Sequence, residues 1–322
     1  MRVAALLCLA LAAPSCGFAA AGGKGGAKKK KPAAGGGGFG ATANKEPKLD
    51  AKAAKILKQV GGNVDAAQEQ HFQSALRRLE KKDPELFTVL MEAEGGLPTG
   101  DAHKKLVELF WDAVAVYMPA RKRDTDSTKM GAEMRSKIES IATLSTASGP
   151  AVLDVGCGDG AMLPHLLKAG AEQGQYLGID IASTMIERAE TAHPKAMFKR
   201  AEFLNLDPMS EAYDGVLLNG VSQFFEDDLV LIDRATKWLK PGGLVVVSHA
   251  QGAKFVADEH NGNRAVARSL LPSPDRLNEI ADALRMEVLT AEECVPDNSA
   301  HTLEGDDFYL VALRLLPRES VL

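Results

Sequence analysis

Glycines at alternate positions interrupt an apolar run in the middle of the chain, at Gly156, Gly158 and Gly160. Residues 151–155, just before them, have the β-branched and apolar character of a buried parallel strand. The glycines lack the Cβ atoms that would hold a ligand away from the backbone. A strand, a glycine turn and a following helix predict a site for a nucleotide.

Two carboxylates lie in or at the end of the predicted strands beside this loop, where they could bind a ligand. Asp154 lies in the predicted strand, and Asp180 ends a second apolar strand over residues 176–180. A carboxylate at the end of a parallel strand, about twenty residues after the glycines, can accept both hydroxyls of a ribose. Asp180 could also cap a helix from Ser183 onward, and the two roles are compatible.

Further elements must position these residues. The pattern predicts additional strands at 196–198, 213–219 and 244–248, with helices between them and a helix opened by Ser273 and Pro274. The helix before the last of these strands is expected to extend to Leu239, and residues 240–243 are expected to form a tight turn into the strand. In an open parallel sheet, ligands bind at the carboxyl ends of the strands. The segments that should meet there are 156–160, 180–181, 202–203, 219–225 and 248–252.

The glycine loop alone does not identify its cofactor. Gly156, Gly158 and Ala161 also satisfy the dinucleotide pattern of nicotinamide enzymes. Three motifs in order are more specific, namely Asp154-x-Gly156-x-Gly158-x-Gly160, Gly178-x-Asp180 and Leu239-Lys240-Pro241-Gly242-Gly243. Together they resemble the class I S-adenosylmethionine-dependent methyltransferases, over roughly residues 151–315.

That resemblance implies an α/β fold, with a Rossmann-like doubly wound sheet that is mostly parallel. It implies a C-terminal antiparallel strand pair, for which 286–289 and 308–314 are suitable. An N-terminal helical region precedes this sheet. Helices are expected near residues 50–60, 72–79, 84–90, 106–117 and 130–141, and we expect the last two to cover the catalytic sheet.

The resemblance also implies S-adenosyl-L-methionine as cofactor, and roles for single residues. Asp154 and the glycine loop would hold its amino acid part, Asp180 the ribose, and Ile181, Met185, Glu202 and Phe203 the adenine. Family members often carry Asp at the position of Glu202. The full expected cofactor set is Asp154, Gly156, Cys157, Gly158, Asp159, Gly160, Asp180, Ile181, Met185, Glu202, Phe203, Asn219 and Gly220. Carboxylates at Asp154 and Asp180 suit a cationic sulfonium and ammonium better than a pyrophosphate.

The methyl acceptor should bind beyond the fourth and fifth strands. Gln223, Phe224 and Phe255 are expected to line an apolar pocket, which favours a small molecule. His249 is the candidate general base, with substrate shaping or loop packing as its alternative role, and His260 is a weaker candidate. Glu226, Asp227 and Asp228 are expected to cap a helix, and no metal site is predicted.

The sequence therefore predicts a methyltransferase that acts on an unidentified, small acceptor. Two alternatives stay open. One is a nicotinamide-dependent oxidoreductase, which the glycine pattern also allows. The other is a non-catalytic adenosyl-binding protein, indicated by the extra helices and by the lack of an obvious acid and base pair.

The N-terminal segment has the features of a targeting sequence. Arg2 precedes a short apolar run over residues 3–13, and small residues follow that run. This order is typical of a signal peptide and its cleavage region. Phe18 follows, and 19–43 contain no Asp or Glu. This resembles the two-part presequence of algae with complex plastids and predicts the plastid stroma, with secretion as the alternative. The predicted divisions are a signal peptide at 1–17, a disordered transit or linker segment at 18–48, a helical accessory region at 49–146 and a methyltransferase domain at 147–322.

Charge and cysteine content limit the class of partner. The net charge of −5 and a pI near 5.9 argue against nucleic acid or a membrane surface as a partner of the folded part. Cys8, Cys16, Cys157 and Cys294 have neither metal-ligand spacing nor a disulfide framework. A reducing compartment is expected. His71 and His103 are interpreted as surface or packing residues, and the oligomeric state is left open.

Overall fold

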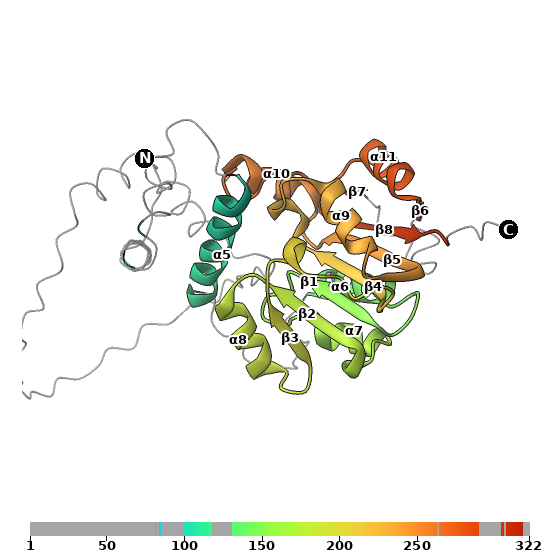
Figure 1. Ribbon diagram of the computed structural model, residues 1–322, viewed down its shortest axis with the longest axis horizontal. Helices are drawn as coiled ribbons and strands as arrows, with labels where there is room; N and C mark the ends of the chain where they lie inside the picture. Colours follow the sequence, from blue (N-terminus) through green and yellow to red (C-terminus); the bar gives the residue numbers. More distant parts are fainter. Residues whose placement is uncertain are drawn as a thin grey trace, which may run out of the picture.

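The computed structural model describes residues 81, 84, 99–117, 131–262, 264–289, 304–305 and 307–317 (Figure 1). The predicted signal peptide, the transit segment, His71, Cys294 and nearly all of the accessory helices before residue 99 lie outside these residues. In the part that is described, no helix is both long and apolar enough to cross a membrane.

A single mixed sheet organises the described chain (Figure 1). Its strands run in the order β3-β2-β1-β4-β5-β8-β6, and the short β7 pairs with β8. The bounds are β1 Val152–Val155, β2 Tyr176–Asp180, β3 Met197–Arg200, β4 Tyr213–Asn219, β5 Leu239–His249, β6 Met286–Leu289, β7 Glu304–Gly305 and β8 Phe308–Leu315. The order reverses between β1 and β4, which is where open α/β sheets bind ligands.

The fold class is confirmed by this pairing. Strands β1 to β5 run parallel to one another, whereas β8 runs antiparallel to both β5 and β6. The predicted segments 286–289 and 308–314 therefore form the antiparallel C-terminal pair. The sheet is Rossmann-like, mostly parallel and flanked by helices.

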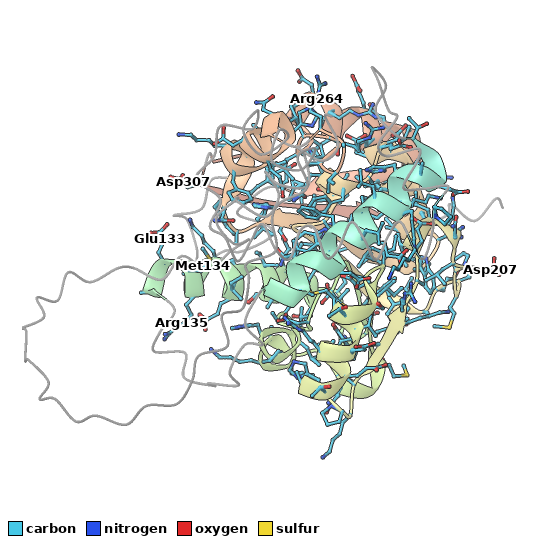
Figure 2. All side chains as sticks on the ribbon, turned by 90° about the vertical axis from the view of Figure 1, so that its left-hand side faces the viewer. Glu133, Met134, Arg135, Asp207, Arg264 and Asp307 are labelled. Atoms are coloured by element: carbon cyan, nitrogen blue, oxygen red, sulfur yellow. The ribbon has the colours of Figure 1, made fainter. Side chains whose placement is uncertain are left out.

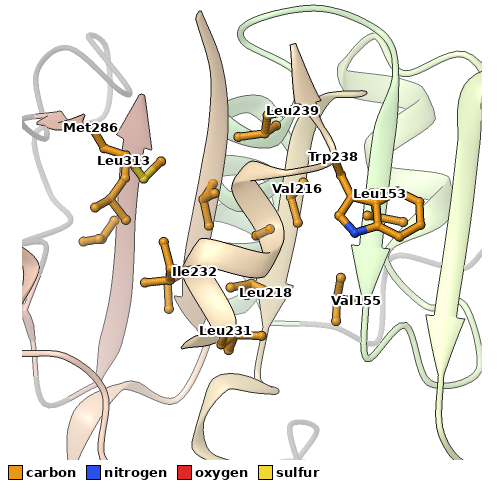
Figure 3. Packing of buried hydrophobic residues seen from close by; sticks show 14 of the residues in the cluster. Leu153, Val155, Val216, Leu218, Leu231, Ile232, Trp238, Leu239, Met286 and Leu313 are labelled. Carbon is orange, nitrogen blue, oxygen red and sulfur yellow. The ribbon is translucent and has the colours of Figure 1, made fainter. Parts of the chain in front are cut away.

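Helices cover both faces of the sheet. The helices are α5 Gly100–Tyr117, α6 Ala132–Ser145, α7 Leu163–Ala169, α8 Ser183–Ala192, α9 Asp228–Thr236, α10 Gly252–Gly262 and α11 Pro274–Leu284. Apolar side chains of α6 and α7 pack with Val152, Leu217 and Val246 on one face. On the other face, Leu231 and Ile232 of α9 pack against the sheet beside Trp238 (Figure 3).

The helix ends follow local rules. Asp227 caps α9 by accepting the backbone N–H groups of Leu229 and Val230, as expected for this acidic cluster. Ser273 caps α11, whose first residue is Pro274, and this also confirms the predicted start.

Two predicted details were wrong, and backbone pairing explains both. Leu239 was expected to end the helix after the fourth strand, but α9 stops at Thr236 and Leu239 opens β5. The segment Lys240-Pro241-Gly242-Gly243 was expected to be a tight turn. It lies within β5 as an irregularity: β4 pairs with Leu239 before it and with Leu244 after it, so residues 240–243 lie opposite Asp214 alone.

The two helices expected to cover the catalytic sheet differ in position. Helix α6 belongs to the layer on one face, because it contacts α7, β4, β5 and β8. Helix α5 contacts α8 instead, and Figures 1 and 2 show it beside the carboxyl ends of the parallel strands. Only α5 is therefore in a position to cover a ligand at these ends.

Candidate functional site

The glycine loop is anchored to the neighbouring strand. The backbone N–H groups of Gly156 and Cys157 donate to the carbonyl of Ile179, over 2.7 and 3.0 Å. Gly156 has φ +70°, and a Cβ there would lie 2.3 Å from Cγ2 of Val221. Gly158 has φ +54°, but a Cβ there would meet nothing within 4 Å. The absence of side chains therefore serves packing at Gly156 and leaves open space at Gly158.

Asp180 is held at the end of β2 by the same loop. Its carboxylate accepts the backbone N–H of Gly158 at 2.9 Å and that of Ala182 at 2.8 Å, one on each oxygen. An ionised carboxylate has about four acceptor positions, so two more hydrogen bonds can be accepted. Burial raises the pKa of Asp180 to about 6, although the backbone hydrogen bonds oppose this shift. The geometry suits the two hydroxyls of a ribose.

Asp154 lies beneath the loop and is 2% exposed. The Tyr176 hydroxyl donates to it over 3.0 Å. Burial raises its pKa to about 7, and the nearby Asp180 carboxyl adds to this shift. Among the described residues, no ion pair joins Asp154 or Asp180 to a basic side chain. A buried carboxyl, Asp154, and a half-buried one, Asp180, beside an open glycine turn therefore fit a cationic ligand.

A cleft of about 370 Å³ lies between α5 and the ends of β2 and β3. Its lining residues come from α5 and from the segments after both strands: Asp101, Lys104, Lys105, Glu108, Ile181, Arg200, Ala201, Glu202 and Asn205. Ile181 and Glu202 are thus brought together in it, as the adenine assignment requires. Glu202 also accepts from the Leu204 N–H through Oε1, while Oε2 lies 3.6 Å from Lys104 Nζ and has no hydrogen-bond partner.

The other two residues assigned to the adenine lie outside this cleft. Phe203 is 3% exposed and its ring stacks with Trp238, at 6.2 Å between centroids, in the core of the sheet. The Glu202 cap on the short turn at Phe203–Asn205 directs Phe203 inward. Met185 is buried on α8 beside Ala182 and Ala115 of α5. The position of Phe203 therefore gives no support to its assigned role against a base.

Three features hold α5 over this region. Asp112 accepts the Thr184 N–H at 2.8 Å and the Ser183 hydroxyl at 3.3 Å, at the start of α8. Glu108 pairs with Arg200 at 2.7 Å. The Trp111 ring packs edge-on against Phe224, at 5.3 Å between centroids. The helix thus contacts the segment that follows Asp180 and also Phe224, which is assigned to the acceptor.

Asn219, Gly220 and His249 meet at the ends of β4 and β5. The Ser248 hydroxyl donates to the Asn219 side chain over 3.0 Å, and the Gly220 N–H donates to the Ser248 carbonyl over 2.7 Å. A Cβ at Gly220 would lie 3.9 Å from His249 Nε2. The imidazole of His249 therefore borders the loop that follows β4.

The environment of His249 bears on its assigned role as a base. Burial lowers its pKa to about 4, so the ring is neutral at pH 7. Nδ1 accepts the backbone N–H of Gln251 at 3.3 Å, which places the ring proton on Nε2, the atom toward Gly220. The ring also stacks with Phe255 at 5.2 Å. This arrangement presents a hydrogen-bond donor to the site, whereas a base would need the other tautomer.

The predicted acceptor residues lie on one side of this loop. Gln223 and Phe224 form the short turn η3, Ser222–Phe224, and Phe255 lies on α10. Gln223 is fully buried, and its Nε2 donates to Glu259 over 3.2 Å. His260, the weaker base candidate, is bonded through Nδ1 to the Ala267 carbonyl at 3.0 Å. His103 is a packing residue, as expected, because it is buried and bonded to the Val266 carbonyl.

Reading the sequence missed Asp112, Trp111 and Glu259. Asp112 and Trp111 lie in a predicted helix, but their partners are 72 and 113 positions away, so no local pattern marks them. Glu259 lies one turn after Phe255 on α10, and that spacing was a usable signal for a shared face. In the described part of the chain, no group of three His, Cys, Asp or Glu side chains is arranged to hold a metal ion.

Known proteins match the region that contains this site. Residues 153–245 match the family model described as a methyltransferase domain. A malonyl-[acyl-carrier protein] O-methyltransferase of Halalkalibacterium halodurans is 30% identical over 104 residues, which are 30% of this chain and 38% of that protein. A ubiquinone biosynthesis O-methyltransferase of Bradyrhizobium sp. is 30% identical over 157 residues, 45% and 58% of the two chains.

A third relative, phosphoethanolamine N-methyltransferase 1 of Triticum aestivum, is 26% identical over 157 residues, which cover 46% of this chain and 31% of that protein. The chain thus spans between about a third and three fifths of the length of these curated relatives. The matched segment begins in β1, includes the glycine loop and Asp180, and ends within β5. The part of the sheet that holds the candidate site therefore matches a methyltransferase domain.

Proposed function

We propose that the chain binds S-adenosyl-L-methionine between α5 and the carboxyl ends of β1 and β2, and transfers its methyl group to a small molecule. The observation that carries this proposal is the pair of carboxyls beside the open backbone of Gly158, namely the buried Asp154 and the half-buried Asp180. They lie within the segment that matches a methyltransferase domain.

When bound, the cofactor supplies a methyl group that is already activated on a sulfonium. The chain then has to bind the cofactor, align the methyl acceptor with the methyl group and exclude water. Asp180 would accept the ribose hydroxyls, and Glu202 would face the adenine from the cleft beside Ile181. Helix α5 would cover the ligand, since Asp112 and Glu108 already fix it across the strand ends.

The oxidoreductase alternative is less compatible with the same residues. A nicotinamide dinucleotide would bring a pyrophosphate to the glycine turn, close to the carboxyl of Asp154. The charge of Asp154 would repel the pyrophosphate and attract a sulfonium or an ammonium, whereas a carboxylate at the position of Asp180 is compatible with either cofactor. No finding favours the non-catalytic alternative, and the assay below distinguishes it through methyl transfer.

Calorimetric titration with S-adenosylhomocysteine tests the proposal. Gly158→Ala should weaken binding at least about tenfold, because its Cβ enters open space at the turn rather than the core. Gly242→Ala is the matched control, since Gly242 also has positive φ and a Cβ there also meets nothing within 4 Å. It lies at the opposite end of β5 from His249 and should leave binding unchanged.

Two results would contradict the proposal. One is the absence of binding by the unaltered protein. The other is an equal loss of affinity in both glycine variants, which would mean that backbone strain and not ligand contact is measured. Transfer of label from methyl-labelled cofactor to a fraction of metabolites then separates an enzyme from a protein that only binds the adenosyl group.

We also propose that residues 1–48 direct the chain to the stroma of a complex plastid. The support is the order of sequence features alone, with Phe18 between an apolar run and a basic, acid-free segment. A fluorescent protein fused after residue 48 should enter the plastid of a diatom. Replacement of Phe18 by Ala should leave the fusion protein outside the inner membranes of the plastid. Export of the fusion protein to the medium would favour secretion instead.

A further inference from the structure

Gln223 has an unusual environment for a side chain beside a ligand site. It is fully buried, and its amide Nε2 donates to Glu259 Oε2 on α10 over 3.2 Å. Its Oε1 is buried and has no hydrogen-bond partner. The amide orientation follows from this network, because only the NH₂ group can donate to a carboxylate.

The backbone around Gln223 is firmly held. Its carbonyl accepts the N–H groups of Arg268 and Ser269, over 2.6 and 3.1 Å. The side chain therefore has little freedom to turn its amide toward another partner. A buried acceptor without a partner destabilises the folded chain, and in native structures such atoms often mark a place for a ligand or a water.

Aromatic side chains lie next to this polar pair. Phe224 follows Gln223 and contacts Trp111 of α5 at 5.3 Å between ring centroids. Phe255 lies one turn before Glu259 on α10 and stacks with His249. An acceptor here would thus meet apolar rings together with hydrogen-bond acceptors.

Three basic side chains nearby already have partners. Arg268 pairs with Glu226 at 3.1 Å, His260 is bonded to the Ala267 carbonyl and His103 to the Val266 carbonyl. Burial also lowers the pKa of His103 and of His249, so these rings are neutral at pH 7. The acceptor atoms of Gln223 and Glu259 therefore lack a nearby cation among these residues. The site favours a ligand that donates hydrogen bonds and disfavours one with negative charge.

We infer that Gln223 and Glu259 recognise an amine on a small apolar methyl acceptor, with Gln223 Oε1 and the Glu259 carboxylate as the accepting atoms. This inference rests on the proposed function. Ser222 Oγ, which is also buried without a partner, can donate as well as accept and does not discriminate between acceptors. A carboxylate or phosphate ester would face Glu259 and be repelled.

The test uses four probes with one apolar body: 2-phenylethylamine, 2-phenylethanol, 3-phenylpropanoate and ethylbenzene. Each is titrated calorimetrically into the full chain, with and without saturating S-adenosylhomocysteine. The amine should bind at least about tenfold more tightly than the carboxylate or the hydrocarbon, and the alcohol should bind between them.

Variants assign the effect to the two side chains. Glu259→Gln should reduce the preference for amine over alcohol about tenfold, because the carboxylate charge is lost while the shape is kept. Gln223→Met should weaken both donors and leave ethylbenzene unchanged. Asp258→Asn is the control, since it removes a neighbouring but exposed carboxylate of α10 and should change nothing.

Three outcomes would overturn the inference: binding of the carboxylate as tightly as the amine, an unchanged amine preference in Glu259→Gln, or binding of none of the probes. Failure of the proposed function is recognised separately, because it is read from S-adenosylhomocysteine itself. A chain that binds S-adenosylhomocysteine but shows no amine preference retains that function and loses only this substrate class. Unfolding midpoints of each variant identify any that fail to fold.

Discussion

The carboxylate of Asp112 accepts the backbone N–H of Thr184 at 2.8 Å and so caps α8 from a helix 72 positions earlier in the chain. Ala182, the residue at the N-cap position itself, makes no side-chain cap bond. One side chain of α5 therefore fixes the segment that directly follows Asp180. This long-range cap joins the covering helix to the predicted ribose site.

Asp112→Ala should lower the free energy of unfolding by about 1 kcal/mol, as loss of a helix cap does. It should also weaken S-adenosylhomocysteine binding several-fold, because α5 loses its attachment to α8. Urea unfolding and calorimetry measure the two effects. Asp227→Ala is the matched control, since it removes the cap of α9; equal loss of affinity in both variants would contradict a specific role for Asp112.

Asp154 should make stability depend on pH. Its pKa is raised from 3.8 to about 7 by burial, so the folded state holds a proton that the unfolded state releases at lower pH. The stability contributed by this proton is fully present below about pH 4 and is lost as the pH rises through 7. The loss is roughly 4 kcal/mol for a shift of this size.

Asp154→Asn removes this dependence, because the amide oxygen can still accept from Tyr176 and carries no proton to lose. Relative to the unaltered protein, the variant should gain stability between about pH 4 and 7 and no more above it. Urea unfolding at a series of pH values measures the difference. Parallel curves for the two proteins would mean that Asp154 does not titrate in this range.

Cofactor binding should release protons near pH 6. Asp180 has a pKa of about 6 and Asp154 of about 7, so both carboxyls are partly protonated there. A sulfonium and an ammonium favour their ionised forms. Affinity for S-adenosylmethionine should therefore rise with pH up to about 8. The rise should be steeper than for the product S-adenosylhomocysteine, whose thioether sulfur carries no charge. Calorimetry in buffers of different ionisation enthalpy detects the protons, and a flat affinity from pH 5 to 8 would exclude the linkage.

The ion pair between Arg200 and Glu108 should affect ligand exchange more than stability. Half of the Arg200 side chain is exposed, so the pair contributes less than about 1 kcal/mol to folding. Arg200→Gln should nevertheless speed dissociation of S-adenosylhomocysteine in stopped-flow measurements, because α5 is held less firmly over the cleft. Arg314→Gln breaks a similarly exposed pair with Glu287, between β8 and β6, and should leave the dissociation rate as it was.

Gly215 tests how closely α6 belongs to the sheet. A Cβ on Gly215 of β4 would lie 2.2 Å from the carbonyl oxygen of Ser145, at the end of α6. Because backbone cannot yield as a flexible side chain can, Gly215→Ala should cost about 3 kcal/mol in urea unfolding. Gly174→Ala, where a Cβ meets nothing within 4 Å, should cost far less. Similar losses at the two positions would argue against tight packing of α6.

Much of the sheet could be predicted from local patterns. The bounds of β2 and β4 agree with the predicted strands, and the glycine loop and Asp180 lie together as their spacing required. These features depend on apolar runs and on glycines, which act locally. The order of motifs then indicated the antiparallel C-terminal pair, which no single strand reveals.

The parts that could not be predicted depend on contacts between distant segments. Phe203 was assigned to the adenine, but stacking on Trp238, 35 positions later, turns it into the core. The segment expected to turn at Gly242 is part of β5, because Leu239 before it and Leu244 after it both pair with β4. No local sequence pattern predicts the contacts of α5 with α8 and with the 266–268 segment.

Helix α5 also sets a fixed spacing between two parts of the molecule. His103 is bonded to the Val266 carbonyl, and Asp112 to the start of α8. Nine residues of helix separate them, which is about 13.5 Å and two and a half turns, so the two side chains point in opposite directions. A single inserted residue between them would rotate one anchor by about 100° relative to the other. The length of this helix is therefore as constrained as its composition, and insertions should be tolerated before residue 103 but not within the stretch that joins the two anchors.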